Sequence, residues 1–257
     1  MEKLNNALWK DDIIICLTFD VDWASEEALR YCYSIIEKYN FKTTFFLTHR
    51  SEFLLDLIDK DYIDSGIHPN FLPNSSHGNS YTEVIDYCMS LLPNAQSFRC
   101  HKYFDVNDIT EILVKKGFKY DSNVCTFLER VEPFLHRSGL IRFPIFFEDG
   151  AYLLHKGNLN FREVGKELFY KPGLIIFNIH PMHMALNSPD FQYARRIKDI
   201  LTWEEWNKLD YKSLEKIRYT GYGISNFIIE FFEFIKNENI KTFSLDELYK
   251  IITSNCK

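Results

Sequence analysis

The sequence lacks the features that mark several large classes of protein. Its 257 residues contain no internal repeat, no low-complexity tract and no linker rich in proline or glycine. We therefore expect a single domain that covers residues 1–257. No cluster of lysine and arginine stands out, and the formal net charge is -6. Nucleic acid and anionic membrane surfaces are therefore poor candidate partners.

Long hydrophobic segments and paired cysteines are missing as well. The opening MEKLNNALWKDD is too polar for a secretory leader, and the apolar stretch NFIIEFFEFI carries two glutamates, which argues against a membrane span. The six cysteines show neither a CxxC pair nor zinc-finger spacing, and most lie in apolar segments. Such cysteines are typical of buried free thiols in a cytosolic protein. We therefore expect a cytoplasmic protein, and the sequence leaves its oligomeric state open.

The chain does contain a regular alternation of strand-like and helix-like segments. The strand-like segments cover residues 12–19, 42–48, 62–68, 96–99, 118–121, 140–147, 173–180 and 240–245. The helix-like segments cover residues 24–40, 51–60, 81–92, 106–117, 223–239 and 244–252. Strands that alternate with helices predict a parallel sheet, and seven or eight such units in this length favour a distorted parallel β/α barrel. Residues 184–222 fit the pattern poorly, and we expect a helical excursion there.

Polar residues follow the predicted strands at the point where each strand ends. They are Asp20, Asp22, His68, Arg99, His101, Asp121, Asp149 and His180. In a parallel β/α fold the carboxyl ends of the strands form one rim, whose loops carry the chemistry. The sequence therefore predicts one polar site, built from residues that are far apart along the chain.

Two of these residues, Asp20 and Asp22, lie side by side after an apolar strand. At positions i and i+2 of an extended chain both point to the same side, where they repel unless a cation neutralises them. One interpretation is a divalent metal with histidine as a companion ligand, where one acid binds the metal and the other acts as a base toward water. The alternative is that both acids cap the following helix. With His68 and His180 expected at the same rim, we favour the metal.

The segments TFDVDW, GIHPN, SFRCH, YDSN and IIFNIHPMH, in this order, resemble the motifs of the polysaccharide deacetylase family. This is the NodB-homology or carbohydrate esterase 4 type, and the chain is most similar to the branch associated with surface-polysaccharide biosynthesis. The resemblance implies a metal-dependent hydrolase that removes an N-acetyl group, or as second choice an O-acetyl group, from a sugar. With the expected cytoplasmic location, this favours a nucleotide- or lipid-linked precursor of a surface polysaccharide as substrate. Asp and His ligands suit zinc, which is our first choice, and also cobalt, nickel or iron.

The resemblance further implies roles for individual residues. Asp20 matches the catalytic base, and Arg99 matches the arginine that orients this base. His180 matches the histidine that protonates the departing amine. Asp22 and His68 match two of the three metal ligands.

The chain departs from the family pattern at two positions. The second histidine ligand of the family lies four residues after the first, where this chain has Leu72. We therefore expect His77, in the loop that follows, as the third metal ligand, with an asparagine or a water as the alternatives. His101 replaces a proline of the family motif, and we interpret it as a substrate contact or an extra ligand.

Three further residues are assigned from their positions in the motifs. Trp23 adjoins the acid pair, and His183 lies one turn after His180, so we interpret both as substrate contacts. His183 also competes with His180 for the role of the acid. Asp149 precedes a glycine in a turn, and we interpret it as structural.

The missing histidine leaves two other functions open. The first is a hydrolase of a different amide on the same scaffold, because a fold does not fix a substrate. The second is a degenerate, metal-free protein that binds carbohydrate or forms a complex. Metal content separates this second alternative from both enzymes.

Overall fold

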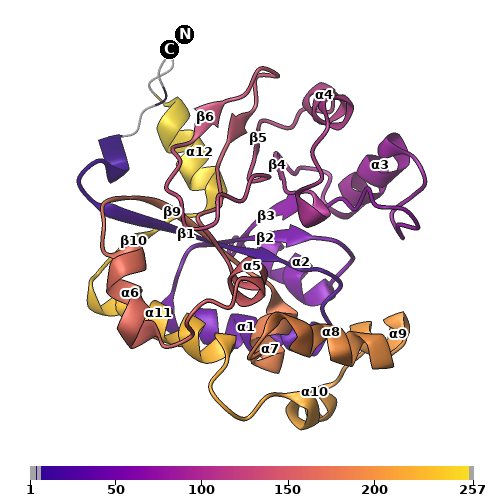
Figure 1. Cartoon of the computed structure of the whole chain (residues 1–257). Coiled ribbons are helices and arrows are strands. Elements are labelled where there is room, and N and C mark those ends of the chain that lie inside the picture. The colour runs from indigo at the N-terminus through magenta and orange to yellow at the C-terminus, as the bar shows by residue number, and fades with distance from the viewer. Residues whose placement is uncertain (1–3, 5–6, 255–257) are drawn as a thin grey trace.

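The computed structural model describes residue 4 and residues 7–254, and one curled sheet lies at its centre (Figure 1). The strands of the described residues are β1 (Ile13–Asp20), β2 (Thr43–Leu47), β3 (Asp64–Ile67), β4 (Ser97–Phe98), β5 (Tyr120–Asp121), β6 (Phe134–Leu135), β7 (Ile141–Arg142), β8 (Phe147–Glu148), β9 (Gly173–Ile179) and β10 (Lys241–Thr242). The helices are α1 (Glu26–Ile36), α2 (Glu52–Asp59), α3 (Tyr81–Leu91), α4 (Asn107–Lys115), α5 (Asp149–Leu154), α6 (Phe161–Phe169), α7 (Pro181–Leu186), α8 (Phe191–Ile200), α9 (Trp203–Asn207), α10 (Tyr211–Ile217), α11 (Ile224–Asn237) and α12 (Leu245–Thr253). Short 3-10 helices cover Ala7–Trp9, Glu37–Tyr39 and His101–Tyr103.

The sheet is almost entirely parallel and curls into a distorted barrel. Its strand order is β6-β7-β5-β4-β3-β2-β1-β9-β8, and β10 pairs with the start of β1. Strands β7 and β8 lie on one segment, residues 141–148, which pairs with β5 at its start and with β9 at its end. This segment therefore joins the two ends of the parallel sheet and confirms the predicted fold class. The antiparallel strand β6, which the sequence pattern did not predict, adds only an exposed edge.

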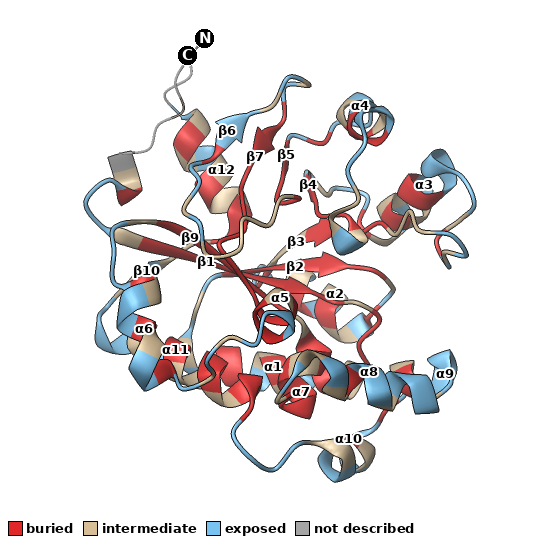
Figure 2. Ribbon diagram, in the orientation of Figure 1, coloured by how far each residue is buried: buried red, intermediate tan, exposed pale blue. Residues whose placement is uncertain are grey.

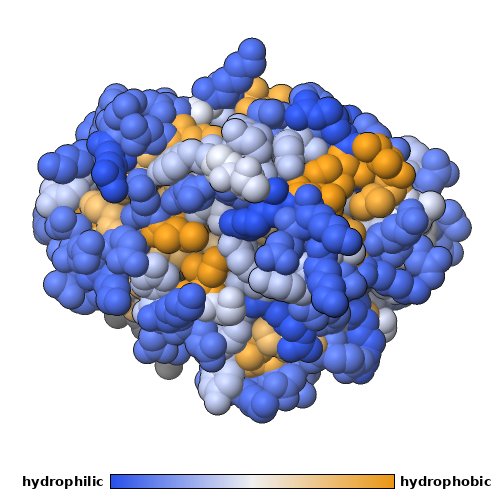
Figure 3. Space-filling model, turned by 90° about the horizontal axis from the view of Figure 1, so that it is seen from below, coloured by the Kyte–Doolittle hydropathy of each residue, from blue (hydrophilic) through white to orange (hydrophobic). Residues whose placement is uncertain are grey.

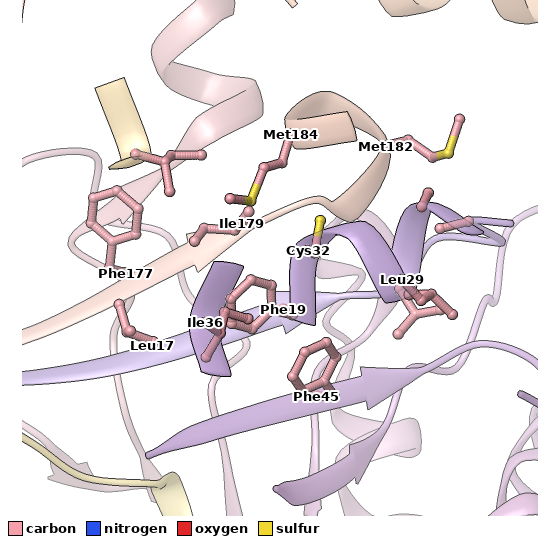
Figure 4. Packing of buried hydrophobic residues seen from close by; sticks show 14 of the residues in the cluster. Leu17, Phe19, Leu29, Cys32, Ile36, Phe45, Phe177, Ile179, Met182 and Met184 are labelled. Carbon is pink, nitrogen blue, oxygen red and sulfur yellow. The ribbon is translucent and has the colours of Figure 1, made fainter. Parts of the chain in front are cut away.

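Side chains along the central strands alternate between two hydrophobic clusters. One cluster lies between the sheet and the helices, and the other lies inside the barrel. In β1, Ile15, Leu17 and Phe19 pack with α1 and α7 in one cluster, which Figure 4 shows from close by. Ile14 and Cys16 belong to a second cluster on the opposite face. Because side chains of a strand alternate between its faces, Thr18 and Asp20 share the face of Ile14 and Cys16. The same period places Asn178 of β9 on that interior face, since Phe177 and Ile179 join the first cluster.

All six predicted helices form, with ends that lie within a few residues of the predicted ones. Ser25 caps α1 by accepting a hydrogen bond from the backbone N–H of Ala28, and Ser244 and Glu247 form a capping box at the start of α12. Gly117 follows α4 with φ +97°, a left-handed conformation that favours glycine. Figure 2 shows the pattern that results, in which the strands at the centre are buried and the outer faces of the helices are exposed.

The segment 184–222 is the predicted helical excursion and comprises the end of α7 together with α8, α9 and α10. It packs on α1, α5 and α7. The lower face of the molecule is mainly hydrophilic, with several separate hydrophobic patches (Figure 3). On the excursion itself, Ile200 and Trp203 are 83% and 58% exposed.

Two expectations about the chain's environment can be compared with this fold. Among the helices of residues 7–254, none has the length and hydrophobicity that a membrane span requires. Five of the six cysteines lie in the described residues, where all are free thiols and four are buried, as predicted. The sixth, Cys256, lies outside the described residues.

Candidate active site

Asp20 and Asp22 occupy different backbone environments although only one residue separates them. Asp20 is the last residue of β1 and is 2% exposed, whereas Asp22 lies in the turn that follows. Asp22 and Trp23 have φ values of +44° and +54°, a region that non-glycine residues rarely adopt. The hydroxyl of Thr48 accepts a hydrogen bond from the N–H of Trp23 at 3.0 Å and holds the turn. The strained turn aims the two carboxylates at different partners, as strained turns at functional sites often do.

The carboxylate of Asp20 is fixed at both of its oxygens. Arg99 Nη1 donates to Oδ1 at 2.8 Å, and Asn178 Nδ2 donates to Oδ2 at 2.8 Å. The Arg99 guanidinium is fully buried, lies over the ring of Phe46 and donates to the backbone oxygen and the hydroxyl of Ser122, each at 2.7 Å. Burial alone would raise the pKa of Asp20, but Arg99 and the nearby histidines outweigh it and lower the pKa below its usual value. Asp20 is thus a positioned carboxylate that stays ionised at neutral pH.

Asp22, His68 and His101 form a group that fits a metal ion. Oδ1 of Asp22 lies 3.0 Å from Nε2 of His68 and 2.9 Å from Nδ1 of His101. One ligand atom from each of the three residues lies within 4.8 Å of the others. Burial would raise the pKa of Asp22, but the two histidines hold it well below its usual range. One carboxylate and two imidazoles are a donor set that suits zinc, cobalt, nickel or iron.

The buried environment of His68 supports the same interpretation. The residue follows β3, is 1% exposed, and its Nδ1 has no hydrogen-bond partner among the described residues. This nitrogen lies 4.0 Å from Oδ1 of Asp20. A histidine that binds a metal through Nε2 presents its other N–H to a nearby acceptor, and the carboxylate of Asp20 lies on that side.

The structure does not bring His77, the expected third ligand, into this group. Its Nδ1 accepts a hydrogen bond from the backbone N–H of Asn70 at 3.1 Å and lies 3.4 Å from the thiol of Cys88. Its ring stacks on Tyr87 with centroids 4.8 Å apart. Burial, together with the nearby histidines, lowers the pKa of His77 to about 4. His77 therefore holds the loop after His68 through its hydrogen bond with Asn70. His101 is the third residue of the candidate metal group.

His180 is held by the carboxylate of Asp149. The Nδ1 of His180 lies 2.6 Å from Oδ1 of Asp149, and its backbone N–H donates to Oδ2 at 2.8 Å. The opposite nitrogen, Nε2, lies 3.9 Å from Oδ2 of Asp20 and 3.7 Å from Oδ2 of Asp22. The interpretation of Asp149 as a structural turn residue is therefore wrong, because its buried carboxylate orients the imidazole of His180. Its position as the first residue of α5, a helix that the sequence pattern did not predict, concealed this role.

The electrostatics of this pair favour a protonated imidazole. Burial alone would lower the pKa of His180, but the carboxylates of Asp149, Asp22 and Glu148 outweigh it and raise the pKa well above its usual value. Glu148 lies 3.4 Å from Nδ1 of His180 and caps α5 through the N–H groups of Gly150 and Ala151. Burial raises the pKa of Glu148 to about 7. His180 therefore carries a proton at neutral pH and can donate it.

A pocket of about 260 Å³ opens over these groups. Its lining comprises Asp20, Asp22, His68, His101, Lys102, Tyr103, Glu148, Gly150, His180, His183 and Phe191. Of the predicted substrate contacts, His183 and His101 line the pocket, and His183 Nδ1 also lies 3.3 Å from the hydroxyl of Ser188. Trp23 is not part of the lining, since it is buried with its ring 5.3 Å from the rings of both His77 and His101. Trp23 therefore packs against the ring of His101 and does not line the pocket.

The sequence analysis missed several residues of the site, and most of them could not have been found from the sequence alone. Asn178 lies inside an apolar strand, and only its pairing with Thr18 across β1 and β9 shows that it faces Asp20. Lys102 and Tyr103 follow His101 in a turn that propensity does not predict. Glu148 could have been suspected from its place after the strand FPIFF, one residue before Asp149.

Comparison with known proteins agrees with the motifs in the sequence. Residues 17–198 match the model of a family described as WbmS-like polysaccharide deacetylase. Among solved structures, the chain is similar to a protein of Bordetella bronchiseptica assigned to the polysaccharide deacetylases and to O-antigen biosynthesis. The identity is 23%, with 85% of this chain and 89% of that chain covered and a TM-score of 0.75, which shows a shared fold.

Two more distant structures show lower TM-scores. One is assigned to the polysaccharide deacetylases of Mycobacterium smegmatis, with 14% identity, 95% of this chain and 98% of that chain covered, and a TM-score of 0.48. The other is the Xyl-CE4 domain of a xylanase from the hindgut metagenome of Trinervitermes trinervoides, with 16% identity, coverages of 93% and 91%, and a TM-score of 0.47. No relative is found among curated proteins. The family match spans more than half of the sequence, and the chain therefore belongs to the WbmS-like polysaccharide deacetylases.

Proposed function

We propose that this protein is a metal-dependent hydrolase that removes an N-acetyl group, or an O-acetyl group, from a sugar precursor of a surface polysaccharide. The observation that carries the proposal is the placement of three groups around one pocket. Asp20 is held by Arg99, the group Asp22–His68–His101 lies beside it, and Nε2 of His180 is 3.9 Å from the Asp20 carboxylate. These are the positions that a base, a metal and an acid need in order to act on one acyl bond.

The residues present fit a divalent metal ion. Asp22, His68 and His101 would hold it, because two imidazole nitrogens converge on one carboxylate oxygen and the buried Nδ1 of His68 has no hydrogen-bond partner among the described residues. When bound, such an ion lowers the pKa of water and polarises an acyl carbonyl. Zinc is our first choice, and cobalt, nickel or iron would suit the same ligands.

Asp20 and His180 would carry the two proton transfers. Asp20 is ionised at neutral pH and takes a proton from the water whose oxygen attacks the acyl carbon. Arg99 and Asn178 hold the carboxylate so that it does not turn away during this step. His180 then gives its proton to the amide nitrogen as the C–N bond breaks, and acetate and an amine leave. Asp149 keeps the imidazole oriented and protonated.

The substrate class is proposed from the family and from its relative. The Bordetella bronchiseptica protein of the same fold is assigned to O-antigen biosynthesis, which supports a surface-polysaccharide precursor as substrate. The five cysteines that the structure describes are free thiols, and this supports a cytoplasmic location because such thiols persist in a reducing compartment. In that compartment the precursor would be a nucleotide-linked or lipid-linked sugar.

Replacement of Asp149 tests the role of His180 as an acid. Asp149→Asn keeps the shape of the side chain but removes the charge that raises the pKa of His180. Because the acid is lost as the pH rises through its pKa, the alkaline limb of the pH–rate profile should move to lower pH. We also expect kcat near neutral pH to fall by at least about 10²-fold. An alkaline limb that stays in place would show that His180 is not the acid.

The proposed function is tested by elemental analysis together with a hydrolysis assay. We expect about one equivalent of a transition metal in the purified protein, and acetate release from an N-acetylated nucleotide sugar that chelation abolishes and added metal restores. Metal without acetate release, across N- and O-acetylated sugars, would favour the hydrolase of a different amide. Absence of metal after incubation with zinc and cobalt would favour the metal-free binding protein.

A further inference from the structure

Tyr103 lines the pocket and has a buried hydroxyl without a hydrogen-bond partner in the described protein. The residue lies two positions after His101, in the 3-10 turn His101–Tyr103, and lines the same pocket as Asp20 and Glu148. Its hydroxyl oxygen is buried, and no described residue forms a hydrogen bond with it. A buried polar group without a partner destabilises the folded chain, so its presence at a pocket points to a partner that arrives with the ligand.

The backbone that holds Tyr103 is strained as well. Lys102 and Tyr103 have φ values of +55° and +54°, and two consecutive non-glycine residues in the left-handed region are unusual. The turn is fixed from both sides. The N–H of Tyr103 donates to the oxygen of Cys100 at 2.8 Å, and the N–H of His101 donates to the oxygen of Pro69 at 2.9 Å. Strain that the surrounding structure maintains in this way is typical of functional sites.

The pocket offers few hydrogen-bond donors for a developing negative charge. Asp20, Asp22 and Glu148 contribute carboxylates, which only accept while ionised. The proton of His180 goes to the departing amine in the proposed mechanism. His68 and His101 belong to the proposed metal group. A tyrosine phenol is protonated at neutral pH and donates one hydrogen bond. Of the other donors in the lining, Lys102 is exposed and Nδ1 of His183 lies 3.3 Å from the hydroxyl of Ser188, whereas the Tyr103 hydroxyl is a buried donor with no partner among the described residues.

We propose that Tyr103 is a further catalytic residue, whose hydroxyl donates a hydrogen bond to the oxygen of the reacting acyl group. The inference rests on the proposed function and adds a side-chain donor for the tetrahedral oxyanion. The hydrogen bond strengthens as the oxygen gains charge, so it acts on the transition state more than on substrate binding.

The test compares Tyr103→Phe with the matched control Tyr193→Phe. The hydroxyl of Tyr193 donates to the backbone oxygen of Ile217 at 2.8 Å, between α8 and α10 and outside the pocket lining. Tyr103→Phe should lower kcat by about 10²-fold with little change in KM, since one oxyanion donor contributes about that much. Its melting temperature should match or exceed that of the wild type, because the lost hydroxyl had no partner. Tyr193→Phe should show the reverse, with full kcat and a lower melting temperature.

Two results would overturn the proposal, namely an unchanged kcat in Tyr103→Phe or a rise in KM alone. A wild-type protein that hydrolyses no acetylated sugar would instead count against the proposed function. In that case the proposed contact of Tyr103 can still be tested by the binding of acetate, the acyl product, which requires no turnover. Titration of acetate into the metal-loaded proteins should give severalfold weaker binding to Tyr103→Phe than to the wild type and Tyr193→Phe. Equal binding to all three would contradict the contact.

Discussion

Asp20→Asn is expected to lower kcat by about 10³-fold while the protein still binds its metal ion. The substitution removes the negative charge that accepts the proton of water, and general base catalysis contributes about 10²–10⁴-fold to a rate. Asp20 is not a member of the group Asp22–His68–His101, so the metal ligands stay intact. Steady-state kinetics on an N-acetylated sugar, with elemental analysis of the same sample, measures both effects.

The structure also predicts a modest cost in stability for this variant. The asparagine oxygen can still accept from Arg99, but its amide nitrogen then faces Nδ2 of Asn178, and two donors meet. Asn178 cannot relieve this by turning over, because its oxygen accepts from Arg99 and from the hydroxyl of Thr18. Thermal unfolding should therefore show a melting temperature a few degrees lower, in a protein that remains folded at the assay temperature.

Asp64→Asn provides a matched control for the loss of a buried carboxylate. Asp64 begins β3 and so lies at the opposite end of the barrel from the rim. Burial raises its pKa to about 6, and its Oδ2 accepts from the hydroxyl of Thr44 and the N–H of Asp246, contacts that an asparagine oxygen can keep. We expect Asp64→Asn to retain full activity. Full activity in Asp20→Asn would contradict the mechanism, and equal losses in both variants would point to a general effect of removing buried charge.

The sequence was sufficient to predict the sheet and the rim where the site lies. The apolar runs of β1 and β9 are long enough to be recognised, and each ends at a polar residue, Asp20 or His180. Because parallel strands share one carboxyl edge, chain order alone then brings these residues together. The motif resemblance supplied the expected partners Arg99, Asp22 and His68, and the structure places all three next to Asp20 or to each other.

The remaining features depend on contacts that no local pattern encodes. The left-handed turn at Asp22 and Trp23 departs from the extended chain that the sequence pattern implied, and the Asp22 carboxylate contacts His68 and His101 whereas that of Asp20 contacts Arg99 and Asn178. Asp149 became a partner of His180 only through the packing of α5 beside β9. The third member of the metal group was assigned to a residue near His68 in sequence, yet the structure supplies it from the neighbouring strand β4, after which His101 follows.

This difference leads to the second large effect, which concerns His101 and His77. His101→Ala and His68→Ala should each weaken metal binding by more than about 10²-fold, since loss of a direct ligand exceeds the 10–100-fold cost of losing an outer partner. Activity should fall with metal occupancy. His77→Asn should keep about one equivalent of metal, because His77 is not a member of the metal group and an asparagine oxygen can accept the hydrogen bond that its Nδ1 accepts from the N–H of Asn70.

Competition with a chromophoric chelator, for the wild type and the three variants, measures the metal affinities directly. The ring centroids of His77 and His101 are both 5.3 Å from that of Trp23, so distance from Trp23 does not tell which histidine is the ligand. What separates them is the 2.9 Å approach of His101 Nδ1 to the Asp22 carboxylate. Loss of metal in His77→Asn with retention in His101→Ala would restore the ligand set expected from the sequence. It would also require the loop of residues 69–80 to rearrange when the metal binds.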